Sequence, residues 1–210
     1  MTGLELIGLL IAWGVAGGSP GPATLTISGT AMAHGRAAGV TVGAGVLAGS
    51  AAWGLASALG MGTLMLANAW IAISLKYAGA AYLLYLAIKA LRSAMAPSGK
   101  ALQRGVSGSL NSVFLKGLLI HLTNPKAILS WGAIYAIALP PGAGFGAVFT
   151  LYLQLVSVSA LVFLGYGVLF SLPMVSRGYA RARRPFEALF AALFGAAALR
   201  IMTARIEGVH

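Results

Sequence analysis

The sequence contains no cysteine and no aspartate, and its only glutamates are Glu5, Glu187 and Glu207. The absence of cysteine excludes disulfides and thiolate metal ligands. The scarcity of carboxylates leaves almost no means of building an oxygen-ligand metal site or a carboxylate pair for acid–base catalysis. We therefore expect neither a metal ion nor another cofactor.

Charged residues of either sign are also scarce. They make up 8% of the chain, whereas hydrophobic residues make up 59% and the mean hydropathy is +0.90. In a soluble domain about a quarter of the residues are charged. This composition predicts an all-α integral membrane protein in contact with the lipid bilayer. The net charge of +11 does not indicate nucleic-acid binding, because Lys and Arg lie in short gaps between apolar runs, as the positive-inside rule describes.

Six apolar runs are long enough to cross a bilayer as helices, which takes about 20 residues each. They cover approximately residues 4–31, 39–66, 70–91, 113–138, 147–172 and 186–203. The first, third and fifth gaps, with their flanks, hold the basic residues Arg36; Lys89, Arg92, Lys100, Arg104 and Lys116; and Arg177, Arg181, Arg183 and Arg184. The second and fourth gaps hold none. This asymmetry predicts that the odd-numbered gaps are cytoplasmic and both termini periplasmic, although Arg200 and Arg205 lie on the outer side.

Two of the runs are interrupted by proline motifs, Ser19-Pro20-Gly21-Pro22 and Asn124-Pro125-Lys126. A proline inside a helix costs roughly 3 kcal/mol, and inside a bilayer the freed carbonyl groups must be satisfied by protein or by a wet cavity. The two motifs are half a chain length apart, and three spans per half reverse the orientation of the second half. The pattern predicts one polytopic domain, 1–210, of two inverted three-helix repeats, 1–91 and 112–210, with a cytoplasmic linker, 92–111. Two unrelated kinks are the alternative interpretation.

The first motif is suited to bind an anion. An unwound helix exposes amide donors at mid-depth, and the half-helix that follows directs its positive N-terminal end at the gap, so a carboxylate is the natural guest. Thr24, Thr26 and Ser28 follow the motif and offer hydroxyl groups. Helix packing or bonding to the preceding turn explains each of these three residues as well.

The second motif contributes Lys126, near the centre of its span, with Asn124 and, slightly earlier, His121. A lysine at mid-membrane is costly and by default marks a functional pathway, and snorkelling to an interface is the competing explanation. A histidine can titrate near neutral pH and is therefore a candidate for coupling transport to protons. A histidine that is simply hydrogen-bonded inside the bundle is the equally weighted alternative.

Other motifs concern helix packing and gating. Gly39, Gly43, Gly45 and Gly49 form small-xxx-small patterns, which are typical of close helix contacts. Arg36, in a tight turn, is a gate contact or an orientation signal, and Lys76 either pairs with Glu5 or snorkels outward.

The stretch Gly17-Gly18-Ser19-Pro20-Gly21 matches the G-x-S-x-G nucleophile elbow. A membrane-embedded serine hydrolase using Ser19 is therefore an alternative function. Against it, Pro20 lacks the backbone amide that would complete an oxyanion hole, and the chain has no Asp for a triad.

The motifs together resemble the lysine exporter / homoserine-resistance (LysE/RhtB) family of amino-acid exporters. The resemblance lies in Ser19-Pro20-Gly21-Pro22, His34-Gly35-Arg36-x-x-Gly39, Lys76-x-x-Gly79-x-x-Tyr82-Leu83-x-Tyr85-Leu86, Lys116-Gly117 and Asn124-Pro125-Lys126-Ala127. It covers nearly the whole chain. It implies proton-driven efflux of amino acids or related small metabolites across a bacterial inner membrane, with the central site formed by Pro20, Gly21, Pro22, Asn124, Pro125 and Lys126.

The chain departs from the family pattern in the second span. Family members often carry an acidic or amide residue after the glycine there, whereas this chain has Ser50 after Gly49. His121, Glu5 and Glu187 are then the remaining protonatable candidates for coupling. A cationic substrate such as lysine is also disfavoured, because no buried carboxylate is available to pair with it.

We therefore expect a proton-coupled secondary transporter, not an enzyme, that exports a small zwitterionic or anionic amino acid or derivative. The expected substrate-binding residues are Ser19, Pro20, Gly21, Pro22, Thr24, His121, Asn124, Pro125 and Lys126. The expected coupling or gating residues are Arg36, Ser50, Lys76, Glu5 and Glu187. A passive small-solute channel is a further alternative, and the sequence leaves open whether the chain forms a homodimer.

Overall fold

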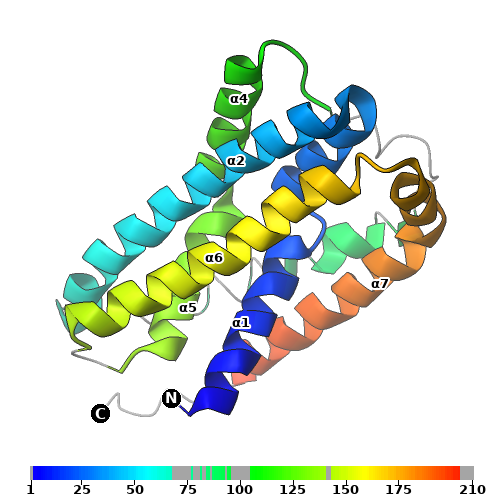
Figure 1. Ribbon diagram of the computed structural model, residues 1–210. Helices are drawn as coiled ribbons and strands as arrows, with labels where there is room; N and C mark the ends of the chain where they lie inside the picture. The colour runs from blue at the N-terminus through cyan, green and yellow to red at the C-terminus, as the bar shows by residue number, and fades with distance from the viewer. Residues whose placement is uncertain are drawn as a thin grey trace.

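The computed structural model describes residues 2–67, 77, 81, 84–85, 87–92, 94–95, 105–140 and 143–203. These residues form helices and no strand, which confirms the predicted all-α class. The first half contains α1 (Gly3–Gly18) and α2 (Pro22–Ala67), and the second contains α4 (Leu110–Leu122), α5 (Pro125–Ala138), α6 (Phe145–Leu169) and α7 (Pro173–Thr203) (Figure 1). The predicted third span, about 70–91, lies largely outside the described residues.

Both predicted helix interruptions are present. α1 ends at Gly18 and α2 begins at Pro22, while α4 ends at Leu122 and α5 begins at Pro125. In each pair a proline occupies the first position of the second helix. A proline is well tolerated there, because the first amides of a helix have no intrahelical acceptor and the fixed φ of proline already suits the helix.

The second helix contains the predicted tight turn at Gly35, whose φ of 80° is the left-handed conformation that favours glycine. The chain folds back on itself at this point. A Cβ added to Gly39 would lie only 2.6 Å from the Cβ of Ala31, so the parts of α2 before and after Gly35 pack closely together. α2 is therefore two helical segments, 22–34 and 36–67.

The second segment of α2 packs between α4 and α6, and α2 and α6 run side by side in Figure 1. Glycines make both contacts. A Cβ on Gly43 would lie 2.8 Å from the Phe163 carbonyl oxygen of α6, and a Cβ on Gly45 would lie 2.1 Å from the Phe114 carbonyl oxygen of α4. The predicted close packing through small residues is confirmed, since no larger side chain fits at these positions.

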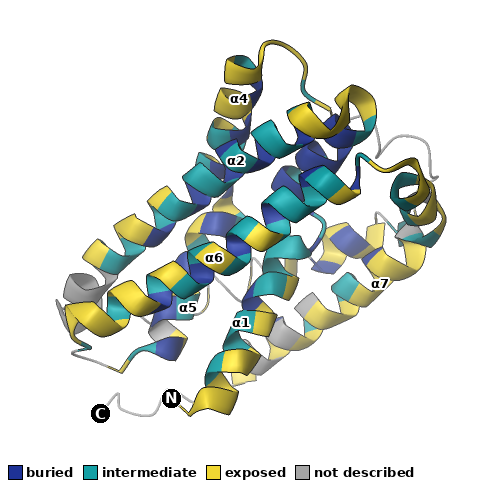
Figure 2. Cartoon of the chain, in the orientation of Figure 1, coloured by how far each residue is buried: buried dark blue, intermediate teal, exposed yellow. Residues whose placement is uncertain are grey.

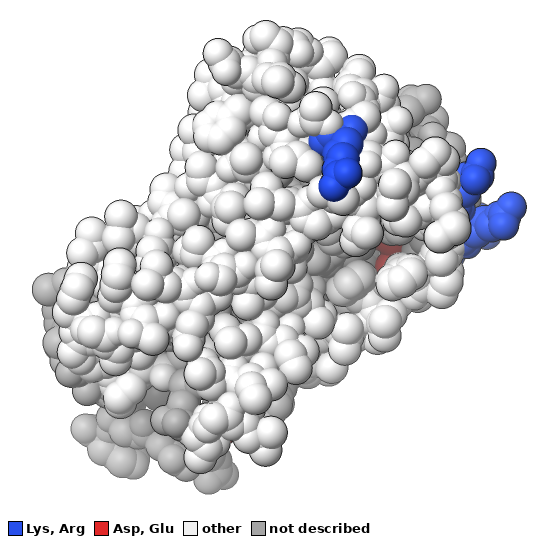
Figure 3. Space-filling model, viewed as in Figure 1, with Lys and Arg blue, Asp and Glu red and all other residues white. Residues whose placement is uncertain are grey.

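The outer surface of the bundle is apolar. α1 exposes Leu4, Ile7, Ile11 and Val15, and Figure 2 shows the buried residues gathered on the inner faces of the helices. Within the described residues, Phe145–Leu169 and the stretch Pro22–Gly60, which folds back at Gly35, are by length and composition apolar enough to cross a membrane. α1 and α4 are shorter apolar helices. On the face shown in Figure 3 the Lys and Arg side chains gather towards one end. This distribution suits a protein surrounded by lipid.

α7 begins earlier than the predicted sixth span. The sequence predicts a span over 186–203 after a basic gap, whereas the helix starts at Pro173 and continues through Pro185. Basic residues mark where the apolar stretch ends, but they do not stop a helix, so the helical backbone extends beyond the span.

The buried core has two parts. One contains Trp13, Trp131, Tyr135, Ala138, Leu151 and Leu155, and the other contains Ala23, Ile27, Val42, Val46, Val113 and Phe163. The two helix interruptions lie near the place where these clusters meet, and that region forms the candidate site.

Candidate functional site

The two prolines of the first interruption deprive two carbonyl groups of their α-helical donors, and other donors pair with both. In an uninterrupted helix the Ala16 carbonyl would accept from residue 20 and the Gly18 carbonyl from residue 22, but both of those residues are prolines. The Ser19 hydroxyl donates to the Ala16 carbonyl at 2.7 Å, and the Tyr166 hydroxyl of α6 donates to the Gly18 carbonyl. The break is therefore compensated by protein, as a break inside a bilayer requires.

Thr24 holds the other side of the first interruption. The Gly21 N–H donates to Thr24 Oγ1 over 3.0 Å, and the Thr24 hydroxyl donates to the Ser19 carbonyl over 3.0 Å. Thr26 and Ser28 instead donate to carbonyl groups in their preceding turns, those of Pro22 and Leu25. Back-bonding is thus the observed arrangement for Thr26 and Ser28.

The second interruption is built as a helix cap. Asn124 is the N-cap residue of α5, and its Oδ1 accepts a hydrogen bond from the Lys126 N–H at 3.1 Å. The Asn124 N–H donates to the His121 carbonyl at 3.1 Å, which satisfies the carbonyl that Pro125 cannot reach. Asn124 is buried, and its side-chain oxygen and its backbone N–H both have partners within the protein.

Lys126 joins the two interruptions, which lie 107 positions apart in the chain. Its Nζ donates to Ser19 Oγ and lies 3.5 Å from the Ser19 carbonyl oxygen. Ser19 is completely buried and Lys126 is partly buried. Gly21 lies beside this contact, and a Cβ there would be in ordinary van der Waals contact with Lys126 Nζ, at 3.8 Å.

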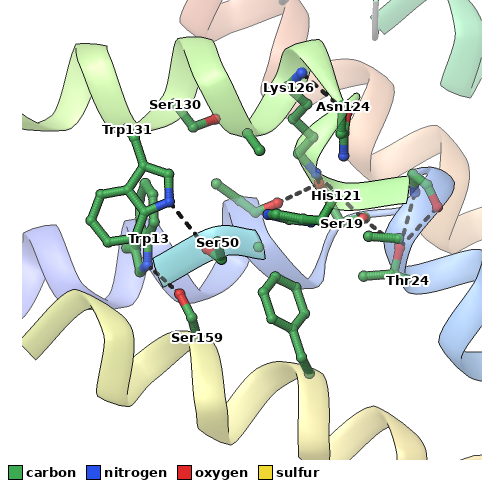
Figure 4. A pocket seen from close by; sticks show the side chains of 16 residues that line it. Trp13, Ser19, Thr24, Ser50, His121, Asn124, Lys126, Ser130, Trp131 and Ser159 are labelled. Carbon is green, nitrogen blue, oxygen red and sulfur yellow. Dashed lines mark hydrogen bonds between the residues drawn. The ribbon is translucent and has the colours of Figure 1, made fainter. Parts of the chain in front are cut away.

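A cavity of about 40 Å³ lies beside this contact, lined by residues of α1, α2, α4, α5 and α6 and of the interruptions between them (Figure 4). It brings together seven of the predicted site residues: Ser19, Gly21, Thr24, Ser50, His121, Asn124 and Lys126. No Asp or Glu is among the described residues that line it. One buried water needs about 10–15 Å³, so the cavity holds a few waters and must widen to admit an amino acid.

Aromatic residues that the sequence reading did not assign to the site form one end of the cavity. The rings of Trp13 and Trp131 meet edge to face, with centroids 4.6 Å apart. The Trp13 indole N–H donates to Ser159 Oγ at 2.9 Å and the Trp131 indole N–H to Ser50 Oγ at 3.1 Å. In the sequence, only the positions of Trp13 and Trp131, one or two helical turns from the proline motifs, indicate that they belong to the site.

His121 lines the cavity and is 5% exposed, and its Nδ1 has no hydrogen-bond partner among the described residues. Its ring meets the Phe163 ring edge to face at 5.4 Å. A buried polar atom without a partner calls for an explanation, and a bound water or ligand is the usual one.

The other predicted residues do not line the cavity. Pro20, Pro22 and Pro125 shape the interruptions without facing it. Glu5 is exposed and caps α1 together with Thr2, Arg36 is exposed beside Gly35, and Glu187 is buried in α7. Lys76 lies outside the described residues.

Comparison with known proteins gives a consistent picture. Residues 17–205 match the family model described as LysE type translocator. The uncharacterised membrane protein YahN of Escherichia coli K12 is 32% identical over 193 residues, which cover 91% of this chain and 84% of that protein. The threonine efflux protein of the same strain is 29% identical over 190 residues, covering 89% of this chain and 92% of that protein.

A shorter match links the chain to the leucine efflux protein of Salmonella choleraesuis, with 32% identity over 116 residues, 55% of this chain and 54% of that protein. No solved structure matches the chain.

Proposed function

The chain belongs to the LysE type translocator family, and from this premise we propose that it exports an amino acid or a closely related metabolite across the bacterial inner membrane as a proton-coupled secondary transporter. Two matched relatives are named as threonine and leucine efflux proteins, which supports an amino acid as the cargo. The expected substrate is a small zwitterionic or anionic molecule.

The observation that carries this proposal is the contact between Lys126 and Ser19 at the edge of a buried cavity. The Lys126 nitrogen, held where two broken helices converge, offers a carboxylate both charge and hydrogen bonds. The α-carboxylate of an amino acid is the group that fits this arrangement. In the transport cycle the carboxylate would replace the Ser19 oxygen atoms as the partner of the Lys126 nitrogen.

The amino group of the substrate needs acceptors rather than donors. The Ser19 carbonyl oxygen beside Lys126 and His121 Nδ1, which lies between the two ends of the cavity, are the candidate acceptors. A second positive charge on the substrate would find no carboxylate among the described lining residues, so desolvating that charge would oppose binding. A zwitterion with an uncharged side chain is therefore the cargo that the cavity fits best.

For the architecture we propose six spans in two inverted repeats, 1–91 and 112–210, with the linker 92–111 in the cytoplasm and both termini in the periplasm. The equivalent interruptions at Pro20–Pro22 and at Pro125 support this arrangement. So does the contact between them, because a site where two discontinuous helices meet is typical of inverted-repeat transporters.

For the proton coupling, His121 is the favoured candidate because it lines the cavity and can be protonated. Ser50 also lines the cavity and is a candidate for gating. Protonation of His121 would remove the acceptor that we assign to the substrate ammonium group, so proton uptake and substrate release would be linked. Arg36, Lys76, Glu5 and Glu187 remain candidates for gating or coupling at other points of the path.

The test is a comparison of Lys126→Met with Lys89→Met, an exposed lysine outside the cavity. Efflux of a preloaded labelled amino acid should fall roughly 10- to 100-fold in the first variant, the loss expected for a charged hydrogen bond, and stay unchanged in the second. Both proteins should insert into the membrane equally. Undiminished efflux by correctly inserted Lys126→Met would refute the site assignment.

The hydrolase alternative has one observation in its favour, since a lysine nitrogen beside a serine hydroxyl is also the composition of a Ser–Lys catalytic pair. The Ser19 hydroxyl hydrogen, however, is directed at the Ala16 carbonyl, and Pro20 offers no oxyanion-hole amide. Covalent labelling of Ser19 by a serine-directed probe would revive this alternative. Efflux that survives a protonophore would instead favour the passive channel.

A further inference from the structure

We propose that Trp13 and Trp131 form the side-chain end of the substrate pocket and restrict the cargo to amino acids with an aliphatic side chain of limited size. This inference rests on the proposed export function and adds to it the chemistry of the substrate side chain. Ser50 and Ser159 act in it as positioning residues that fix the two indoles.

The cavity has two chemically different ends. Figure 4 shows Lys126, Asn124, Ser19 and Thr24 on one side, Trp13 and Trp131 on the other, and His121 between them. An amino acid has the same division, with a charged backbone end and a side chain. If Lys126 binds the carboxylate, the side chain extends towards the tryptophans.

The tryptophans present carbon to the cavity. The indole N–H is the only polar group of a tryptophan, and in both residues it is already used. Trp13 donates to Ser159 Oγ and to the Leu155 carbonyl, at 2.9 and 3.0 Å, and Trp131 donates to Ser50 Oγ at 3.1 Å. A charged side chain placed against these rings would lose its water without gaining a charged partner, so an aliphatic one is favoured.

The wall formed by Trp131 cannot recede. Three atoms of its six-membered ring lie 2.8–2.9 Å from the position that a Cβ on Gly54 would occupy, so the ring is seated directly on the α2 backbone. Trp131 is 1% exposed, and Tyr135 stacks on it with centroids 5.8 Å apart. A pocket with such a rigid wall discriminates by size, and one methylene in an apolar pocket is typically worth roughly 10- to 200-fold in specificity.

The experiment measures efflux from cells preloaded with alanine, leucine, phenylalanine or lysine, and reports ratios so that differences in expression cancel. The wild-type protein should export alanine and leucine in preference to phenylalanine and lysine. Trp131→Phe enlarges the pocket and should raise the phenylalanine-to-leucine ratio by about tenfold or more. Gly54→Ala pushes the indole into the pocket and should lower the leucine-to-alanine ratio.

Trp53→Phe is the matched control, because the Trp53 indole donates to the Leu122 carbonyl and does not line the cavity. Its ratios should equal those of the wild type. If Trp131→Phe fails to reach the membrane, the phenylalanine-to-leucine and leucine-to-alanine efflux ratios of Trp13→Phe and Gly54→Ala provide the test instead.

The outcomes separate the two proposals. A wild-type protein that exports none of the four amino acids contradicts the proposed function itself. A wild-type protein that exports them, but whose ratios are the same in all the pocket variants, or that exports lysine as readily as leucine, overturns only the assignment of the tryptophans.

Discussion

Single hydroxyl groups keep the first helix interruption stable inside an apolar bundle. Pro20 and Pro22 cannot donate to the carbonyl groups of Ala16 and Gly18. The Ser19 N–H and hydroxyl donate to the first of these carbonyls, and the Tyr166 hydroxyl donates to the second. An unsatisfied polar group in a membrane costs several kcal/mol, so the helix interruption requires these donors.

Tyr166→Phe should therefore destabilise the protein by about 1–3 kcal/mol, because it leaves the partly buried Gly18 carbonyl without this donor. Tyr135→Phe removes a buried hydroxyl that has no partner among the described residues, and it should cost nothing. Thermal unfolding in a mild detergent compares the two variants. Equal melting temperatures would show that the Tyr166 hydroxyl does not support the break.

Asn124 combines two roles that substitutions can separate. Asn124→Ala removes the cap of α5 and should lower the stability by about 1 kcal/mol, whereas Asn124→Asp keeps a good cap. The new carboxylate in Asn124→Asp would compete with the substrate for Lys126, so this variant should fold normally and export poorly. Melting temperature and efflux are measured on the same preparations. The melting temperature should fall in Asn124→Ala, and efflux should fall in Asn124→Asp. Full efflux by Asn124→Asp would argue that the carboxylate site lies elsewhere.

Among the helices, α2 determines the spacing of the bundle. It reaches α6 through Gly39 and Gly43 and α4 through Gly45 and Gly49, with backbone almost touching backbone. In a bilayer such contacts replace the hydrophobic effect, which does not drive one apolar helix against another. The helices that line the cavity are therefore held together by close van der Waals packing of complementary surfaces.

Gly167→Ala and Gly165→Ala test this packing on one helix. A Cβ at Gly167 would lie 2.7 Å from the backbone of Gly39, whereas a Cβ at Gly165 meets nothing within 4 Å. The first substitution should destabilise the protein by about 1–3 kcal/mol through overpacking, and the second should be neutral or slightly stabilising. Thermal unfolding in detergent again provides the measurement, and a tolerated Gly167→Ala would mean that α2 and α6 move apart at little cost.

The sequence predicts these elements well because their causes are local. The prolines at positions 20, 22 and 125 interrupt their helices by removing backbone donors, although α7 continues through Pro185. A row of glycines predicts a close helix contact without naming the partner helix. The tryptophan end of the cavity could not be predicted, because Trp13 meets Ser159 across 146 positions and only the tertiary fold brings them together. The start of α7 was missed for a different reason, since hydropathy locates the membrane edge and not the end of a helix.

At the scale of the whole molecule, the contact between Ser19 and Lys126 ties the two halves of the chain together beside a small cavity. Apolar clusters adjoin the cavity on both sides, with Trp13 and Trp131 in one and Ala23 and Phe163 in the other. In the arrangement described here the cavity is too small for an amino acid. Transport must then separate the halves enough to enlarge it.

The absence of cysteine allows a direct test of this opening, because any introduced thiol is the only one present. Ser130→Cys lies in the cavity lining and should react slowly with a water-soluble thiol reagent at rest and faster during efflux. Ser107→Cys is exposed in the linker and should react at one rate throughout. A Ser130→Cys thiol that is labelled at a constant, high rate would show that the cavity is already open.

The small size of the cavity also has a physiological consequence. When only a fraction of the molecules is competent to bind, the apparent dissociation constant is the intrinsic one divided by that fraction, so a competent population of about one in a hundred weakens binding about a hundredfold. For the export function proposed above, a cavity of about 40 Å³ that must widen before it binds would raise the substrate concentration at which efflux begins. The free energy of opening would then set the concentration at which the cell starts to lose the amino acid.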